Sequence, residues 1–260
     1  MILDNFVSII TGASRGIGKG IAKEFAKNGA TVIITDVDID EGKRVEREIS
    51  EKGGNSYFIK TDVTSDSDIK NMVEEVMDQY GKIDTLINNA GITVFKPLIE
   101  TSLDDWNQVI NTDLRGVFLC SKYVAEKMVE KQSGSIINIS SNHAIATLPD
   151  SEIYAAAKAG VIGFSKSMAL SLGEKGIRVN TICPGFTDTT HYQTWLNQYK
   201  DPAKVEQEVI GLHATKRINN ASDVAKLCIY LASEHSIQVT GADIVIDGGV
   251  SSRLYNSKIC

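Results

Sequence analysis

Thr11-Gly12-Ala13-Ser14-Arg15-Gly16-Ile17-Gly18 is the stretch of sequence that decides the fold. An apolar, β-branched run at 6–10 precedes it, and an amphipathic run with helical spacing follows at 17–25. This order predicts a strand, a glycine-rich turn and the N-terminus of a helix. Glycine lets the backbone approach a pyrophosphate, and the helix offers unpaired N–H groups and its positive dipole end. By itself the pattern also fits an ordinary strand-to-helix turn. We expect phosphate binding by Gly12, Ser14, Arg15, Gly16, Ile17 and Gly18.

A carboxylate at the end of the next apolar run indicates which cofactor this turn would hold. Asp36 follows the run 31–35, about 20 residues after the glycine turn. A carboxylate at that point accepts hydrogen bonds from a ribose diol and repels a 2′-phosphate. We therefore predict NAD rather than NADP, although Arg15 in the turn offers a phosphate partner. The alternative for Asp36 is a solvated acid at a strand end.

A second motif, Tyr154-Ala155-Ala156-Ala157-Lys158, predicts proton chemistry. Tyr154 and Lys158 are four residues apart, so a helix places them on one face. There the ammonium stabilises the phenolate, which allows the phenol to give up and regain a proton near neutral pH. Taken alone, a tyrosine and a lysine at this spacing also fit an ordinary pair on a helix surface.

Composition restricts the partners and the compartment. The chain has 260 residues, 42% of them hydrophobic, which suits one α/β domain spanning 1–260. Its net charge of −6 argues against a nucleic-acid or anionic-membrane surface and favours a small-molecule substrate. Neither a run long enough to cross a bilayer nor a signal peptide is evident, so we expect a cytoplasmic protein. The scattered cysteines and histidines lack metal-ligand spacing, and no metal is predicted.

The order of elements predicts the fold class. Apolar runs alternate with segments of helical periodicity, several of which follow Ser, Thr or Asp caps. This alternation predicts a Rossmann-type, doubly wound parallel sheet with helices on both faces. The expected strands are 6–10, 31–35, 57–59, 85–87, 135–139, 177–182 and 244–246. The expected helices after the first are 40–51, 67–80, 103–131, 154–174 and 222–233.

Residues 187–216 interrupt this alternation. The segment is polar and rich in aromatic residues and histidine, and it shows no strand pattern. It leaves from a carboxyl end of the predicted sheet, where ligands of doubly wound folds bind. We predict a substrate lid in which Tyr192 and Trp195 contact substrate. The alternative is a helical hairpin on the surface or a subunit contact.

With these motifs in place, the chain resembles the short-chain dehydrogenase/reductase family, classical type, along essentially its whole length. The resemblance implies a catalytic Asn111, Ser141, Tyr154 and Lys158. Ser141 is preferred to Ser140 because it lies thirteen positions before Tyr154, the usual family spacing. The motifs that carry the resemblance are 11–18, Asp62-Val63, 88–91, 110–112, 138–141, 154–158, Asn180 with Pro184-Gly185, and 247–249. The resemblance also implies that Asp62 and Val63 border the adenine and that Asn89, Ala90 and Gly91 line the cofactor. Thr187 and Thr189 would approach the nicotinamide amide, and Pro184 and Gly185 would also bind the cofactor.

The resemblance implies an NAD(P)-dependent enzyme that acts on CH–OH groups by hydride transfer. Tyr154 would serve as general acid and base, Ser141 would hydrogen-bond the alkoxide, and Asn111 would support a water chain from Lys158. His143 faces substrate or caps its loop. Family members usually form homotetramers through helices that match 103–131 and 154–174.

For the reaction we expect a secondary alcohol and its ketone, or a lactol and its lactone. Aromatic and polar residues in the lid favour a sugar or polyol substrate. The alternatives are a 3-oxoacyl-thioester reductase, a hydroxysteroid dehydrogenase and, in another class, a dinucleotide-sensing module without catalysis.

Overall fold

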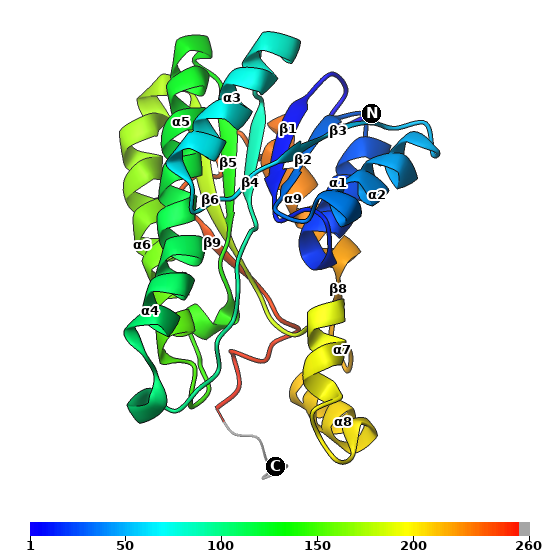
Figure 1. Cartoon of the computed structure of the whole chain (residues 1–260), viewed down its shortest axis with the longest axis vertical. Coiled ribbons are helices and arrows are strands. Elements are labelled where there is room, and N and C mark those ends of the chain that lie inside the picture. The colour runs from blue at the N-terminus through cyan, green and yellow to red at the C-terminus, as the bar shows by residue number, and fades with distance from the viewer. Residues whose placement is uncertain (255–260) are drawn as a thin grey trace.

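The computed structural model describes residues 1–254. Within them the main sheet has seven strands, all parallel, in the order β3-β2-β1-β4-β5-β6-β9 (Figure 1). This arrangement confirms the predicted single doubly wound domain. The strands are β1 Val7–Thr11, β2 Thr31–Asp36, β3 Asn55–Lys60, β4 Thr85–Asn88, β5 Gly134–Ile139, β6 Ile177–Pro184 and β9 Asp243–Ile246.

Two apolar cores, one on each face of the sheet, hold the helices in place. Successive strand residues point to opposite faces, so Ile9 joins one core and Ile10 joins the other. The core that contains Ile10 packs against α1 Gly16–Lys27, α2 Ile39–Ser50 and α9 Ala221–Ala232. The core that contains Ile9 packs against α3 Asp66–Tyr80, α5 Gly116–Lys131 and α6 Glu152–Leu172.

Most predicted boundaries agree with the structure to within two residues. At the starts of helices this agreement reflects capping side chains that can be recognised in the sequence. Asp38, Ser65 and Asn220 each accept a backbone N–H at the start of α2, α3 and α9. The strand predicted at 57–59 is longer in the structure, spanning Asn55–Lys60. β3 is an edge strand and is partly exposed. The polar residues at its two ends do not extend the apolar run, so the pattern predicts only its middle.

The single helix predicted at 103–131 is divided in the structure. α4 Leu103–Ile110 is followed by a π-helical turn at Asn111–Arg115 and then by α5. In that turn the Gly116 N–H donates to the Asn111 carbonyl, five residues back. π-turns of this kind often occur at functional sites, and this one brings Asp113 into the interior.

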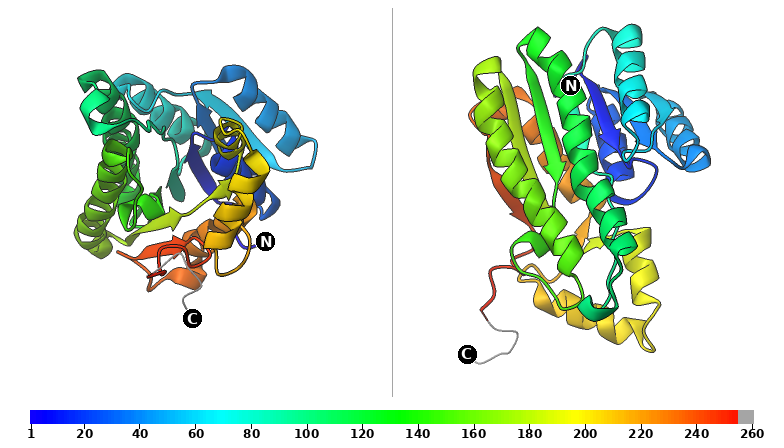
Figure 2. Two further views of the ribbon diagram at one scale, coloured as in Figure 1. Left: turned by 90° about the horizontal axis from the view of Figure 1, so that it is seen from below. Right: turned by 60° about the vertical axis from the view of Figure 1, so that its left-hand side comes forward.

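The lid predicted at 187–216 is a pair of helices, α7 Thr190–Leu196 and α8 Pro202–Leu212, below the sheet (Figures 1 and 2). The expectation that it contains no strand is wrong at its first residues. β7 Thr187–Asp188 pairs in parallel with β8 Asn219–Asn220. Two polar residues are too few to give a strand pattern. The helices form a small apolar core of their own around Leu196 and Val209.

None of the helices in residues 1–254 combines the length and apolarity needed to span a membrane. Cys120, Cys183 and Cys228 are buried free thiols, while Cys260 lies outside the described residues.

Candidate active site

The glycine turn lies where the sheet order reverses, between the carboxyl ends of β1 and β4. Thr11 Oγ1 accepts hydrogen bonds from the Asn89 and Ala90 N–H groups, at 3.0 Å each. The Asn89 amide donates to the carbonyls of Thr11 and Gly12, at 2.9 and 3.0 Å. These bonds join the two loops at the position where doubly wound sheets bind nucleotides.

Backbone crowding explains why the turn requires glycine. Gly12 has φ +63°, and a Cβ there would lie 2.8 Å from the Ala90 Cα. A Cβ on Gly18 would lie 2.3 Å from the Gly12 carbonyl oxygen and 2.5 Å from Asn89 Nδ2. At the start of α1, Arg15 provides no side-chain cap, so the first N–H groups of the helix are left for a ligand. This glycine cradle suits a dinucleotide pyrophosphate.

The end of β2 presents Asp36 to this turn. Ser14 donates to Asp36 Oδ2 from its hydroxyl at 2.6 Å and from its N–H at 3.2 Å. Arg15 Nη2 lies 2.8 Å from Asp38 Oδ2, so the guanidinium of the turn is paired with a carboxylate. Two acidic side chains therefore lie where the adenosine ribose of a bound dinucleotide is expected.

Three other predicted cofactor segments lie at the same edge of the sheet. After β3, Asp62 Oδ1 accepts from the Thr64 N–H at 2.8 Å, and Val63 packs against Gly116. After β6, the Thr187 hydroxyl donates to the Gly185 carbonyl at 2.9 Å. A Cβ on Gly16 would lie 3.5 Å from Thr189 Cγ2, so the start of the lid contacts the glycine turn. Of the remaining predicted residues, Pro184 ends β6, and Ala90 and Gly91 lie in the loop after β4.

Tyr154 and Lys158 occupy one face of α6, as their spacing predicts. Lys158 is 4% exposed, and its Nζ donates to the Ile139 carbonyl at 3.2 Å. The Nζ lies 5.6 Å from the centre of the Tyr154 ring. Burial by itself lowers the pKa of Lys158, but the Asp113 carboxylate and Tyr154 outweigh burial and raise that pKa. Lys158 is therefore a buried cation beside a phenol.

The structure separates the roles of the adjacent serines. The Ser140 hydroxyl donates to the Lys158 carbonyl at 2.8 Å and so fastens α6 to β5. Ser141 Oγ accepts the His143 N–H at 3.2 Å, within a short turn whose His143 ring lies 5.5 Å from the Tyr154 ring. His143, two residues after Ser141, therefore lies beside Tyr154, and the preference for Ser141 over Ser140 stays a prediction.

The structure places Asp113, and not Asn111, against Lys158. Asp113 Oδ2 lies 3.0 Å from Lys158 Nζ, and Asp113 is fully buried. Asn111 lies two residues earlier in the π-turn, where its carbonyl accepts from Gly116. The expected role of Asn111 in a water chain from Lys158 stays a prediction. The sequence carries no clear signal for Asp113, because it stands among other polar residues in 103–115.

Comparison with known proteins agrees with this geometry. A family model described as enoyl-(acyl carrier protein) reductase matches residues 12–251. The chain belongs to the short-chain dehydrogenase/reductase family, classical type. It is 36% identical to an uncharacterized oxidoreductase of Thermotoga maritima, covering 97% of this chain and 98% of that one. It is 39% identical to the 3-oxoacyl-[acyl-carrier-protein] reductase FabG of the same organism, covering 96% and 99%.

A solved structure gives a similar result. A gluconate 5-dehydrogenase from Burkholderia cenocepacia, in complex with NADP and tartrate, superposes with a TM-score of 0.91 at 30% identity and 97% coverage of each chain. As a short-chain dehydrogenase/reductase, the protein is an NAD(P)-binding oxidoreductase that acts on CH–OH groups of small molecules.

The aromatic residues predicted to contact substrate are found inside the lid of this short-chain dehydrogenase/reductase. Tyr192 is 5% exposed, and its ring packs on Phe186 and Trp195. Trp195 also packs edge-on against Tyr199. These rings fill the lid core, and a substrate role for Tyr192 and Trp195 stays a prediction.

Phe95 and His143 lie beside Tyr154 instead, and the sequence pattern indicates neither Phe95 nor Thr93, a residue that contacts the lid. The Phe95 ring lies 6.3 Å from the Tyr154 ring and 6.1 Å from the His143 ring. His191 Nε2 on α7 lies 2.8 Å from Thr93 Oγ1 in the loop after β4. Phe95 and Thr93 have no motif signal, because their place depends on how a loop folds over the sheet edge. Burial lowers the pKa of His143, which favours its neutral ring.

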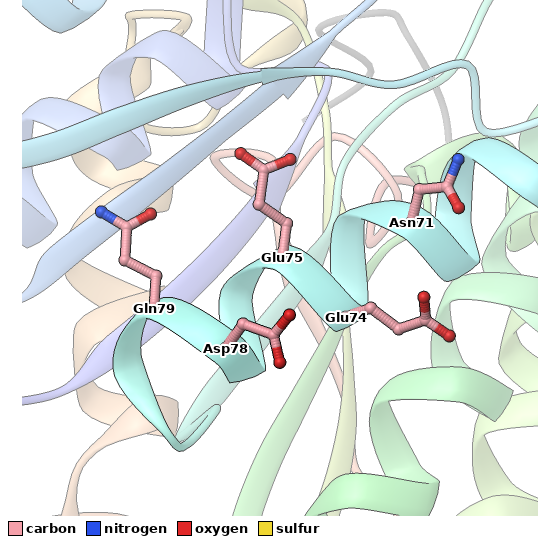
Figure 3. Close-up of a pocket in the computed structure, with 5 residues that line it drawn as sticks. All are labelled: Asn71, Glu74, Glu75, Asp78 and Gln79. Carbon is pink, nitrogen blue, oxygen red and sulfur yellow. The ribbon is translucent and has the colours of Figure 1, made fainter.

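A hollow on the outer face of α3 is unrelated to this site. It is lined by polar and acidic side chains that project from one helix, as Figure 3 shows. The lining residues are Asn71, Glu74, Glu75, Asp78 and Gln79. Their place on a helix that flanks the sheet gives them no contact with the carboxyl-end loops.

Proposed function

We propose that this short-chain dehydrogenase/reductase is an NAD-dependent dehydrogenase that interconverts a secondary alcohol and a ketone, or a lactol and a lactone. The observation that carries the proposal is the placement of a buried Lys158 one helical turn from Tyr154, with Ser141 in the adjoining loop. All three residues lie at the sheet edge that carries the glycine cradle.

A bound nicotinamide supplies or accepts the hydride in this reaction. Tyr154 donates a proton to the carbonyl oxygen in reduction and takes it from the alcohol in oxidation. The Lys158 cation stabilises the phenolate between these steps. The Ser141 hydroxyl, whose oxygen is oriented by the His143 N–H, donates a hydrogen bond to the charge that develops on the substrate oxygen.

The choice of NAD rests on the charges at the ribose end. Asp36 is anchored by Ser14, so a 2′-phosphate would meet a fixed carboxylate. Arg15 is held by Asp38, which weakens its availability as a phosphate partner. NADP bound in the Burkholderia cenocepacia relative is the observation that favours the alternative.

For the substrate we favour a sugar or polyol. His143 lies beside Tyr154 and bonds to Thr147, so polar groups suited to a hydroxylated substrate adjoin the site, and Phe95 offers a ring face for stacking. Likeness to a gluconate 5-dehydrogenase supports this choice. Identity to FabG supports the alternative, a 3-oxoacyl-thioester substrate. A net charge of −6 argues against a basic surface for an acidic carrier protein.

The test is substrate-dependent absorbance at the nicotinamide band, with NAD and NADP offered separately. Sugars, polyols, steroids and acetoacetyl thioesters are the substrates to compare. We expect turnover of a sugar or polyol with kcat/KM at least about tenfold higher for NAD, equivalent to about 1.4 kcal/mol. Preference for NADP or for the thioester would contradict the proposal. NAD binding without turnover of any substrate would indicate the sensing module.

We also propose that the protein is a homotetramer assembled through α5 and α6. Phe118 on α5 is 45% exposed and pairs with Phe164 on α6, at 6.1 Å between ring centres. Leu170 on α6 is 85% exposed. An exposed apolar face on the two long helices is suited to an interface between copies of the chain.

A further inference from the structure

The buried pair Asp113 and Lys158 carries an inference beyond the acid–base chemistry. Asp113 Oδ1 accepts the Ile92 N–H at 2.8 Å, and Oδ2 lies 3.0 Å from Lys158 Nζ. A Cβ on Gly91 would lie 2.8 Å from Oδ2 and 3.2 Å from Nζ, so the loop after β4 closes over the pair. Both side chains are at least nine-tenths buried.

The charge of Asp113, rather than its shape, requires an explanation. A neutral asparagine has the same outline, and its amide oxygen would accept the same Ile92 N–H. Removing a carboxylate from water is costly, and a buried ion pair recovers that cost only in part. The pair is therefore weak evidence of a stabilising role. Its place beside Tyr154 indicates a role in the reaction instead.

The electrostatic surroundings of the pair are simple. Lys158 is faced by Asp113 on the π-turn, by Tyr154 on the same helix and by Cys183 on β6. Tyr154 is faced by Lys158 and by the ring of His143, a residue on the short turn after β5. Because burial lowers the pKa of Lys158 and Asp113 raises it, the carboxylate keeps the amine charged. The same negative charge offsets the pull of that cation on the phenol proton.

We propose that Asp113 is a positioning residue that fixes Lys158 beside Tyr154 and offsets its charge, so that alcohol oxidation becomes active at a higher pH than it would with a neutral side chain at this position. This rests on the proposed function. Removing the carboxylate leaves an uncompensated cation beside the phenol, and that cation favours the phenolate more strongly. The pH at which alcohol oxidation becomes active therefore falls.

The test is Asp113→Asn, assayed for kcat/KM of alcohol oxidation against pH. We expect the acidic limb of the profile to move down by about one pH unit or more, as for a charge several ångströms away at an effective dielectric near 20. Affinity for NADH, measured by its fluorescence, should stay within about twofold. Asp104→Asn removes one charge from an exposed position on α4 and is the matched control, with no shift expected.

A second measurement needs no substrate and separates failure of this inference from failure of the proposed function. The phenolate absorbance that Tyr154→Phe abolishes should appear at lower pH in Asp113→Asn than in the unmodified chain. The proposal would be overturned if Asp113→Asn left unchanged the pH midpoints of both the kcat/KM profile and the phenolate absorbance. It would also be overturned if the variant lost activity equally at every pH. Asp113→Ser makes the same change in charge if the asparagine variant does not fold. If neither folds, Asp113 is structural and the proposal is wrong.

Discussion

At the scale of single residues, the glycine cradle is the part of the molecule that tolerates least change. Gly12 and Gly18 are required because the Asn89–Ala90 loop is hydrogen-bonded directly against the turn. The requirement thus comes from protein packing as well as from the approach of a ligand. This explains why the pattern at 11–18 and the motif at 88–91 occur in one chain.

Gly18→Ala tests this packing. The added Cβ would meet the Gly12 carbonyl oxygen at 2.3 Å, and backbone cannot move aside as a flexible side chain can. We expect a loss of about 2 kcal/mol or more in unfolding free energy, together with loss of NADH binding. Denaturant unfolding and NADH fluorescence are the measurements.

Gly211→Ala is the control for that substitution. It lies in α8 with nothing within 4 Å of the added Cβ, so stability should be unchanged or raised by up to about 1 kcal/mol. Equal stability and equal NADH binding in the two variants would contradict the packing argument.

At the scale of elements, the sequence predicts the helices and strands whose apolar residues repeat at a regular spacing. The seven strands and the capped helices follow from apolar periodicity and from caps such as Ser65 and Asn220. The choice of Ser141 follows from the family spacing to Tyr154 and stays a prediction. The π-turn does not follow from periodicity, because the helical segments on either side of it each keep their own spacing. Asp113 lies in that turn, with its carboxylate 3.0 Å from Lys158 Nζ.

Long-range contacts account for the rest of what the sequence does not reveal. The lid was predicted from its polarity and its place after β6, whereas the burial of Tyr192 depends on α7 and α8 packing on each other. Phe95 reaches Tyr154, and Thr93 reaches His191 of the lid, through a loop without a pattern. Such contacts depend on the folded arrangement of distant segments.

His191→Ala tests whether α7 closes over the substrate. Its Nε2 lies 2.8 Å from Thr93 Oγ1, and this bond links the lid to the loop after β4. Loss of one such hydrogen bond costs about 1 kcal/mol, so we expect KM for the substrate to rise about fivefold with NADH affinity unchanged. Steady-state kinetics give both quantities.

Thr194→Ala is the matched variant on the same helix, because within residues 1–254 its hydroxyl bonds only to the Thr190 carbonyl. Its KM should equal that of the unmodified protein. A rise of the same size in both variants would mean that the effect comes from α7 stability and not from closure.

At the scale of the whole molecule, the exposed apolar face of α5 and α6 predicts assembly. We expect light scattering to report four times the 28.3 kDa mass of the chain. Phe118→Asp places a charge in the centre of the proposed interface, and burial of an unpaired charge should dissociate the tetramer. The measurement is molar mass across a dilution series.

Asn71→Asp adds the same charge to the outer face of α3 and should leave the mass unchanged. A monomeric unmodified protein, or a tetramer that persists in Phe118→Asp, would contradict the proposed interface.

The central claim is that Tyr154 transfers the proton that accompanies hydride transfer. The most direct measurement compares Tyr154→Phe with the unmodified protein for both NADH binding and turnover. The ring is retained, so packing against Phe95 and His143 is preserved and only the hydroxyl is lost. The account predicts NADH affinity within about twofold and a kcat lower by about 10²-fold or more. Retained turnover in Tyr154→Phe would contradict it.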